Sequence, residues 1–371
     1  SVEVTKAPTC MPPSQLKIDS ISTDSVVITY KLRAAATGYE YAYGGINETD
    51  PSNLTTIATG DTIKLGGLTP HTSYRLWVRS QCGTGTYSDW SFTSIAFTTR
   101  CQDIHAVNED FESVAKDSIP ECWSKISSSY AKYPKVVTAS AADGVTSKAM
   151  KFYSSHPQYL VLSKIDTALN KLQLRFDLNK ESKDCGIFQV GYMTKPTDGN
   201  TFVPVASFND KGQKFYKKML RKRVFFTGVA DNGNNRYIAF RFGQVGNETF
   251  AKNWYYWLDS ISVQTAPTCQ PPYNIENTFV SKDSAVIGYK RPAAALSVQY
   301  VFIEYDTITD PSTLTPIQNT STSDTIKLSG LGSNKTYKLW LRSDCGAGSV
   351  SDWTDPISFT TVCEDVTAIN E

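Results

Sequence analysis

The sequence lacks the patterns that mark most enzymes and membrane proteins. It has only three histidines and four methionines, and none of its apolar runs approaches the roughly 20 residues of a membrane-spanning helix. It contains no His-Glu-x-x-His, no Gly-x-Ser-x-Gly and no phosphate-binding loop. We therefore predict that this part of the protein is not an enzyme, has no catalytic residues and does not insert into a membrane.

The sequence also lacks an excess of either charge. Its 37 basic and 36 acidic residues leave a net charge of +1, which gives no reason to expect nucleic acid or an anionic membrane surface as a partner. Few stretches show helical spacing, whereas Ser, Thr, Asn and Gly clusters recur between short alternating runs. That alternation, with 12% aromatic residues, predicts an all-β protein.

The cysteines do not show the spacing of a zinc site. None of the eight belongs to a Cys-x-x-Cys pair, and histidines are too few to complete the usual ligand sets. Several cysteines stand at matching places in two repeated segments. Such cysteines favour disulfides, and therefore an oxidising, extracytoplasmic compartment.

The repeat is the clearest feature of the chain. Leu68–Trp90 returns as Leu331–Trp353, with Tyr, Leu-Trp, Arg-Ser, Cys-Gly and Ser-Asp-Trp in the same order. We interpret these segments as two copies of one β-sandwich domain, at 1–100 and 264–371. The chain ends within a segment that, in the first copy, leads into another domain, so we expect a piece of a longer tandem array.

The repeated segment resembles the tyrosine corner of fibronectin type III domains. Leu68-Thr-Pro-His-Thr-Ser-Tyr74 follows the L-x-P-x-T-x-Y pattern, and alternating residues after it indicate a strand with one buried face. The second copy keeps Leu331, Thr336 and Tyr337 but has Ser333 in place of the proline. The resemblance implies that each corner tyrosine packs inward while its hydroxyl ties back the corner backbone. In the topology that it implies, Cys10 pairs with Cys82, and Cys269 with Cys345.

A different and larger domain is expected at 101–263. Its opening Asp110-Phe-Glu-Ser and its closing Trp254-Tyr-Tyr-Trp-Leu-Asp259 resemble the jelly-roll modules of the MAM and cleaved-adhesin kind, which occur beside type III domains in bacterial surface proteins. Alternating runs between these ends predict its strands: 159–162, 172–178, 187–192, 202–207, 223–226 and 237–242.

The remaining cysteines are assigned around this domain. Cys101 and Cys122 flank its opening strand, and we predict that they pair. Cys363 would then find its partner in a following domain. Cys185 is left over and is interpreted as a buried thiol.

Three carboxylates are candidate metal ligands. Asp110 and Glu112 are expected on one face of the first strand, with Phe111 on the other, and Asp259 lies in the last strand. The jelly-roll resemblance implies that these strands are neighbours with a structural Ca²⁺ near their seam, and hard oxygen ligands suit that ion. Surface carboxylates or turn caps would give the same pattern.

Aromatic residues supply the candidate ligand-binding site. The jelly-roll resemblance implies sugar binding by stacking of aromatic rings on pyranose faces, and Trp254, Tyr256, Tyr130 and Tyr133 are the residues expected to be exposed. Strand parity places Trp257 in the core with Ile261 and Val263. Ordinary core or rim packing is the alternative.

These inferences combine into one hypothesis. We expect an elongated, monomeric rod of three β-sandwiches, type III, jelly roll, type III, in a secreted or surface-anchored bacterial protein. The jelly roll would bind a glycan or a host or matrix protein without catalysis, and the type III domains would act as spacers. The alternatives are a purely structural spacer array, or an accessory module of a protease or glycoside hydrolase outside this piece.

Overall fold

The computed structural model describes most of the chain. The described residues are 8–127, 132–140, 144–145, 147–153, 157–181, 186–208, 219–234, 236–243, 255–304, 310–314, 317–319 and 324–363. Strands dominate them, as the alternating runs predict, and the all-β fold class is confirmed. None of their helices is long and apolar enough to span a membrane. The chain divides into two compact units, Ser1–Ile104 and His105–Glu371.

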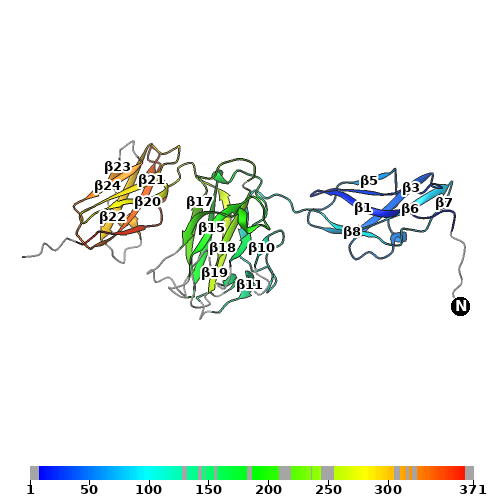
Figure 1. The fold of residues 1–371 in the computed structure, drawn as a ribbon, viewed down its shortest axis with the longest axis horizontal. Coiled ribbons are helices and arrows are strands. Elements are labelled where there is room, and N and C mark those ends of the chain that lie inside the picture. Colours follow the sequence, from blue (N-terminus) through cyan, green and yellow to red (C-terminus); the bar gives the residue numbers. More distant parts are fainter. Residues whose placement is uncertain are drawn as a thin grey trace, which may run out of the picture. The chain divides into compact units, whose positions relative to one another are not determined.

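The first unit is a two-sheet sandwich, drawn in blue to cyan in Figure 1. Its core combines both sheets and includes Ile28, Ile63, Leu76 and Val78, none of which is exposed. One sheet has the order β1-β2-β5 and the other β4-β3-β6-β7, with β8 paired to β6. The bounds are β1 Ser14–Ile21, β2 Val26–Lys31, β3 Gly38–Gly45, η1 Pro51–Asn53, β4 Ile57–Thr59, β5 Thr62–Leu65, β6 Ser73–Gly83, β7 Thr86–Tyr87 and β8 Ile95–Thr98.

The tyrosine corner forms in both copies as the sequence predicts. The backbone N–H of Thr69 donates to the Tyr74 hydroxyl over 3.0 Å, and that of Gly332 donates to the Tyr337 hydroxyl over 2.8 Å. Tyr74 also stacks on Phe97 at 5.7 Å between ring centres. Each ring thus fills the sandwich while its oxygen satisfies a turn amide that has no strand partner.

The second unit contains two sandwiches, of which the first (green in Figure 1) follows the jelly-roll prediction in strand content. Aromatic side chains fill the space between its sheets: Phe176 contacts Phe208 and Phe240 at 5.6 and 5.3 Å between ring centres. One sheet runs β10-β13-β18-β15-β16, with β10 Ser124–Ile126, β13 Gln158–Val161, β18 Tyr237–Phe242, β15 Phe188–Met193 and β16 Val203–Phe208. Short helices η3 and η4 span Leu169–Lys171 and Gly199–Thr201.

The other sheet of this sandwich carries the predicted sites. Its order is β11-β12-β19-β14-β17, and β9 pairs with β19, so the first and last strands are neighbours as the jelly-roll resemblance implies. The bounds are β9 Val107–Glu109, β11 Lys135–Thr138, β12 Lys148–Tyr153, β14 Leu172–Lys180, β17 Leu220–Phe225 and β19 Tyr255–Thr265.

A β-bulge in β19 changes which side chains face the core. Ser260 has φ 49°, and the register against β14 shifts by one residue between Arg175 and Asp177. An extra residue in one strand reverses the alternation beyond it. Tyr256 and Leu258 therefore face the core together with Ile261 and Val263, and all four are buried.

The last sandwich, coloured yellow to red, repeats the first. Its sheets are β20-β21-β24 and β23-β22-β25-β26, and Tyr289 is buried in its core, as Tyr30 is in the first copy. The bounds are β20 Tyr273–Val280, β21 Ser284–Lys290, β22 Ser297–Glu304, η5 Pro311–Thr313, β23 Ile317–Asn319, β24 Thr325–Ser329, β25 Thr336–Asp344 and β26 Ile357–Thr360.

Candidate functional site

Three tyrosines gather on the solvent side of the β11-β12-β19 sheet. Tyr153 and Tyr255 are directly paired across β12 and β19, and their ring centres are 5.1 Å apart. Tyr133, just before β11, completes the group at 5.8 Å from Tyr153 and 6.0 Å from Tyr255. All three side chains are half-buried. We call these three residues the tyrosine patch.

Lysine ammonium groups lie over the rings of this patch. Lys151 Nζ is 3.6 Å from the centre of the Tyr255 ring and 4.4 Å from that of Trp257. Lys135 Nζ is 5.1 Å from the centre of the Tyr133 ring. Lys125 Nζ lies nearby and donates to the Pro134 carbonyl over 3.4 Å, while burial, followed by the charge of Lys135, lowers the pKa of this lysine. Lys135 Nζ also pairs with Asp117 Oδ1 at 2.5 Å, so the patch combines apolar ring faces, phenol groups and the positive charge of Lys151.

The predicted aromatic site is only partly correct. Tyr133 lies in the patch, but Tyr256 does not: its side chain is fully buried, packs on Phe242 at 4.7 Å between ring centres, and donates its hydroxyl to the Gly186 carbonyl over 2.9 Å. The β-bulge at Ser260 is the reason, because it invalidates the parity count made from Val263 back to Trp257.

The remaining aromatic candidates have different outcomes. Trp254 and Tyr130 lie outside the described residues. Trp257 is buried as predicted, with 3% exposure, but on the outer face of the sheet, where it packs with Val145 and Ala149. Tyr153 and Tyr255 were not predicted. Each lies on the same strand face as a residue two positions away, Lys151 for Tyr153 and Trp257 for Tyr255.

A second candidate site is the acidic seam between β9 and β19, which consists of Asp110, Glu112, Asp259 and Asp177. The strand predicted through Asp110 and Glu112 is wrong, because β9 ends at Glu109. Phe111 adopts a left-handed φ of 61°, and Asp110 Oδ1 accepts the Glu112 backbone N–H over 3.1 Å. The Phe111 backbone N–H donates to Glu109 Oε1 over 2.6 Å. Asp110 and Glu112 therefore belong to a tight turn and not to a strand.

Asp259 is the most perturbed acid of this seam. Burial raises its pKa to about 6, and the negative charges of Asp177, Glu112 and Asp110 add to that rise, whereas a hydrogen bond from the Ser260 N–H opposes it. Asp177 is its cross-strand neighbour in β14. Three acids therefore lie close enough to disfavour the charged form of Asp259.

The chemistry of the seam fits a hard cation, but the acids do not form a closed cage. Among the described residues, no three carboxylates bring ligand oxygens within 4.8 Å of one another. Two protein cations lie at the seam: Lys148 Nζ donates to the carbonyls of Glu112 and Val114 over 2.8 and 3.0 Å, and Arg221 pairs with Asp177 at 2.6 Å. Asp110, Glu112 and Asp259 would supply the carboxylates of a Ca²⁺ site.

In each repeated domain a disulfide joins the segment before the first strand to the end of the long strand β6 or β25. Cys10–Cys82 and Cys269–Cys345 have Cα separations of 5.9 Å, and these are the pairs that the type III resemblance implies. Cys101 and Cys122 are each disulfide-bonded. Cys363 is a free, exposed thiol in this chain, and Cys185 lies outside the described residues. These bonds are typical of extracellular proteins.

Comparisons with known proteins match parts of the chain. Residues 11–96, which are most of the first sandwich, match the model of the Fibronectin type III domain. The fn3 domain of the human collagen alpha-1(XX) chain is 21% identical, with 28% of this chain and 97% of that domain covered and a TM-score of 0.23. No curated protein matches the chain.

Solved adhesin domains are also similar to part of the chain. The K2 cleaved adhesin domain of Lys-gingipain is 16% identical and has a TM-score of 0.33, with 43% of this chain and 98% of that domain covered. The K1 cleaved adhesin domain of Lys-gingipain from Porphyromonas gingivalis W83 is 17% identical, also with a TM-score of 0.33, and the match covers 44% and 99%.

Proposed function

We propose that this chain is a non-catalytic extracellular binding protein whose central sandwich binds a glycan at the tyrosine patch. The observation that carries the proposal is the contact of Tyr133, Tyr153 and Tyr255 with one another on a solvent-facing sheet, under the ammonium groups of Lys151 and Lys135. Such a cluster would expose aromatic faces at low cost in side-chain entropy, because a tyrosine has two side-chain torsions.

The chemistry of the patch selects a saccharide that carries acidic groups. The C–H face of a pyranose ring is apolar and packs on an aromatic face, while its hydroxyls can bond the phenol groups. Lys151 would pair with a carboxylate or sulfate on the sugar, and Lys135, whose Nζ already pairs with Asp117 Oδ1 at 2.5 Å, would add positive charge nearby. A neutral glycan would make no use of the positive charge of Lys151.

The cation at the acidic seam is a proposal of the same kind. The repulsion of the Asp259 carboxylate by Asp177, Glu112 and Asp110 supports it, because a divalent cation would offset that repulsion. The ion would be structural and would brace the β9–β19 pairing.

A bacterial cell surface is the proposed location. The disulfides of both repeated domains and the likeness of the chain to type III and adhesin domains support an extracellular setting. In this setting the last type III sandwich would act as a spacer.

A screen of the full 371-residue chain on an array of neutral and acidic glycans tests this function. We expect retention of uronate-, sialate- or sulfate-bearing glycans and no retention of their neutral counterparts. Retention of neutral glycans alone would contradict the charge argument. No retention at all would favour the alternative in which all three domains are spacers for an enzyme or adhesin elsewhere in the protein.

A further inference from the structure

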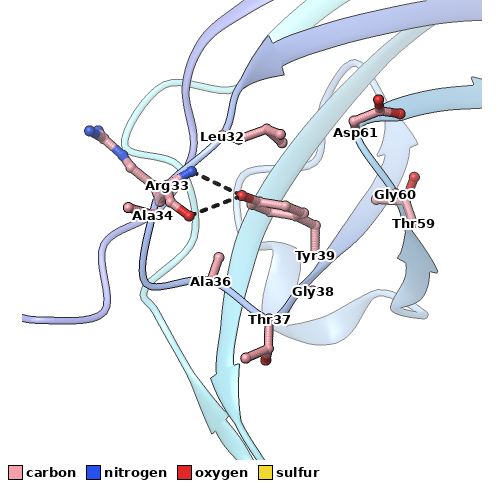
Figure 2. Close-up of a pocket in the computed structure, with 10 residues that line it drawn as sticks. All are labelled: Leu32, Arg33, Ala34, Ala36, Thr37, Gly38, Tyr39, Thr59, Gly60 and Asp61. Carbon is pink, nitrogen blue, oxygen red and sulfur yellow. Dashed lines mark hydrogen bonds between the residues drawn. The ribbon is translucent and has the colours of Figure 1, made fainter.

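The first sandwich has an open groove at one end of its sheets, shown in Figure 2. Its volume is about 650 Å³, and its walls come from the turn between β2 and β3 and from the turn between β4 and β5. The Tyr39 ring lies at its base, packed edge-on against Tyr30 at 5.2 Å between ring centres. Asp61 stands on the opposite wall from Arg33.

The second copy of the domain shows what this place can hold. Tyr30-Lys31-Leu32 corresponds to Tyr289-Lys290-Arg291, and Asp61 corresponds to Asp324 at the start of the next paired strand. In the second copy, Arg291 Nε donates to Asp324 Oδ1 over 3.2 Å, and one terminal nitrogen donates to the Leu296 carbonyl over 3.5 Å. Lys290 Nζ also lies 3.8 Å from Asp324 Oδ2, so this carboxylate is paired within the chain, with the Arg291 guanidinium as its nearer partner.

The first copy lacks that guanidinium. Leu32 replaces the arginine and is 49% exposed, so its apolar side chain is accessible at the groove. None of the ion pairs described for residues 8–127 involves Asp61. An exposed apolar side chain and an unpaired carboxylate thus face the same groove.

Arg33 does not take over the missing role. Its Nε donates to the Pro12 carbonyl over 2.9 Å, and Figure 2 shows its guanidinium directed away from Asp61. Its backbone instead fixes the groove, because its N–H donates to the Tyr39 hydroxyl over 2.9 Å and its carbonyl accepts from that hydroxyl over 3.4 Å. The Tyr39 ring is thereby held in place with little exposure.

We propose that this groove binds an arginine side chain of a partner protein. The guanidinium would pair with Asp61, as Arg291 pairs with Asp324, and its alkyl stem would pack on Leu32 and the Tyr39 ring. Arginine fits better than lysine because its planar fork can pair with a carboxylate through two parallel hydrogen bonds and can stack on an aromatic ring. The proposal goes beyond glycan binding, because it gives a recognition role to a domain otherwise expected to be a spacer.

Ligand-observed NMR titration of the full chain tests this. The probe is N-acetyl-arginine amide, and the matched control is N-acetyl-citrulline amide, which has the same shape without the charge. We expect weak, saturable binding of the arginine probe at one site and a loss of about threefold or more with the citrulline probe. Equal binding of both probes, or no saturable binding of either, would overturn the proposal.

Variants that exchange the residues at position 32 of the first copy and position 291 of the second copy give a sharper test. Leu32→Arg should abolish probe binding by supplying the internal guanidinium, whereas Leu32→Met should preserve it. Arg291→Leu should open a second site and raise the stoichiometry from one to two. Asp61→Asn should weaken binding as citrulline does. Unchanged binding in Leu32→Arg, with a melting temperature equal to that of the native chain, would refute the site and leave glycan binding at the tyrosine patch unaffected.

Discussion

Lys151 Nζ lies 3.6 Å from the centre of the Tyr255 ring, on the solvent side of the central sandwich. The same ammonium lies 4.4 Å from the Trp257 ring centre. This lysine therefore covers the Trp257 ring on the outer face of the sheet and brings positive charge to the tyrosine patch.

We predict that Lys151→Ala destabilises the central sandwich by about 0.5–1 kcal/mol and abolishes any preference for acidic over neutral glycans. Lys151→Arg should retain both, because a guanidinium also packs on aromatic rings. Calorimetric unfolding and glycan binding measure the two effects. A full preference for acidic glycans in Lys151→Ala would show that the charge is not used in recognition.

The tyrosine corners give a paired test of stability. Tyr74→Phe and Tyr337→Phe each remove a hydroxyl that accepts a turn N–H, so each should destabilise its own sandwich by about 1 kcal/mol. Tyr87→Phe is the control, since Tyr87 is 37% exposed and lies away from the corner. The measurement is the unfolding transition of each domain. Equal transitions for Tyr74→Phe and Tyr87→Phe would mean that the corner bond adds nothing.

The raised pKa of Asp259 leads us to predict that the stability of the central sandwich depends on pH when no metal is bound. Its pKa is raised from 3.8 to about 6 by folding, so the folded state favours the protonated acid. The contribution of this acid to stability is therefore fully present below about pH 4, is lost as the pH rises towards 6, and stays lost above that. Allowing for solvent screening, the loss is on the order of 1–2 kcal/mol.

Asp259→Asn should remove this dependence. In chelator at pH 7.5, the variant is expected to melt higher than the native chain, with a flatter profile between pH 4 and pH 6. Melting curves across that range are sufficient. A variant with the same profile as the native chain would locate the pH dependence elsewhere.

The Ca²⁺ proposal predicts that, when the ion is supplied, the Asp259 carboxylate stabilises the folded state instead of destabilising it. Calcium should raise the melting temperature of the central sandwich in the native chain, because a ligand that binds only the folded state stabilises it. The rise should vanish in Asp259→Asn. An identical melting temperature with calcium and with chelator would count against a metal at the seam.

The disulfides should be worth more than these single contacts. Cys10–Cys82 closes a loop with a sequence separation of 72, so replacement of both cysteines by serine should destabilise the first sandwich by roughly 3–4 kcal/mol. The same change at Cys269 and Cys345, with a separation of 76, is the matched comparison. Losses below about 1 kcal/mol in both would indicate that the unfolded chain is already constrained.

Local patterns predicted the fold well. Three patterns can be recognised within short segments: the repeat, the strand alternation and the Leu-x-Pro-x-Thr-x-Tyr corner. Each of them indicates one kind of local structure. The pairing of β9 with β19 followed from the jelly-roll resemblance.

The site was harder to predict because it depends on register between distant strands. Tyr153 and Tyr255 are neighbours only through the pairing of β12 with β19, and the parity of β19 depends on a bulge at Ser260 that no glycine announces. Asp110 and Glu112 were assigned to a strand because the positive φ of Phe111, a rare conformation for an aromatic residue, has no signal in the sequence. Register and bulges are set by packing, which a single sequence does not display.

The most direct test of the account is calorimetric titration of the full chain with an acidic glycan retained on the array, comparing Tyr255→Ala with Phe92→Ala. Phe92 is a fully exposed aromatic residue of the first sandwich and serves as the control. The account predicts at least about a tenfold loss of affinity in Tyr255→Ala and native affinity in Phe92→Ala. Native affinity in Tyr255→Ala, with the central sandwich still folded, would contradict it.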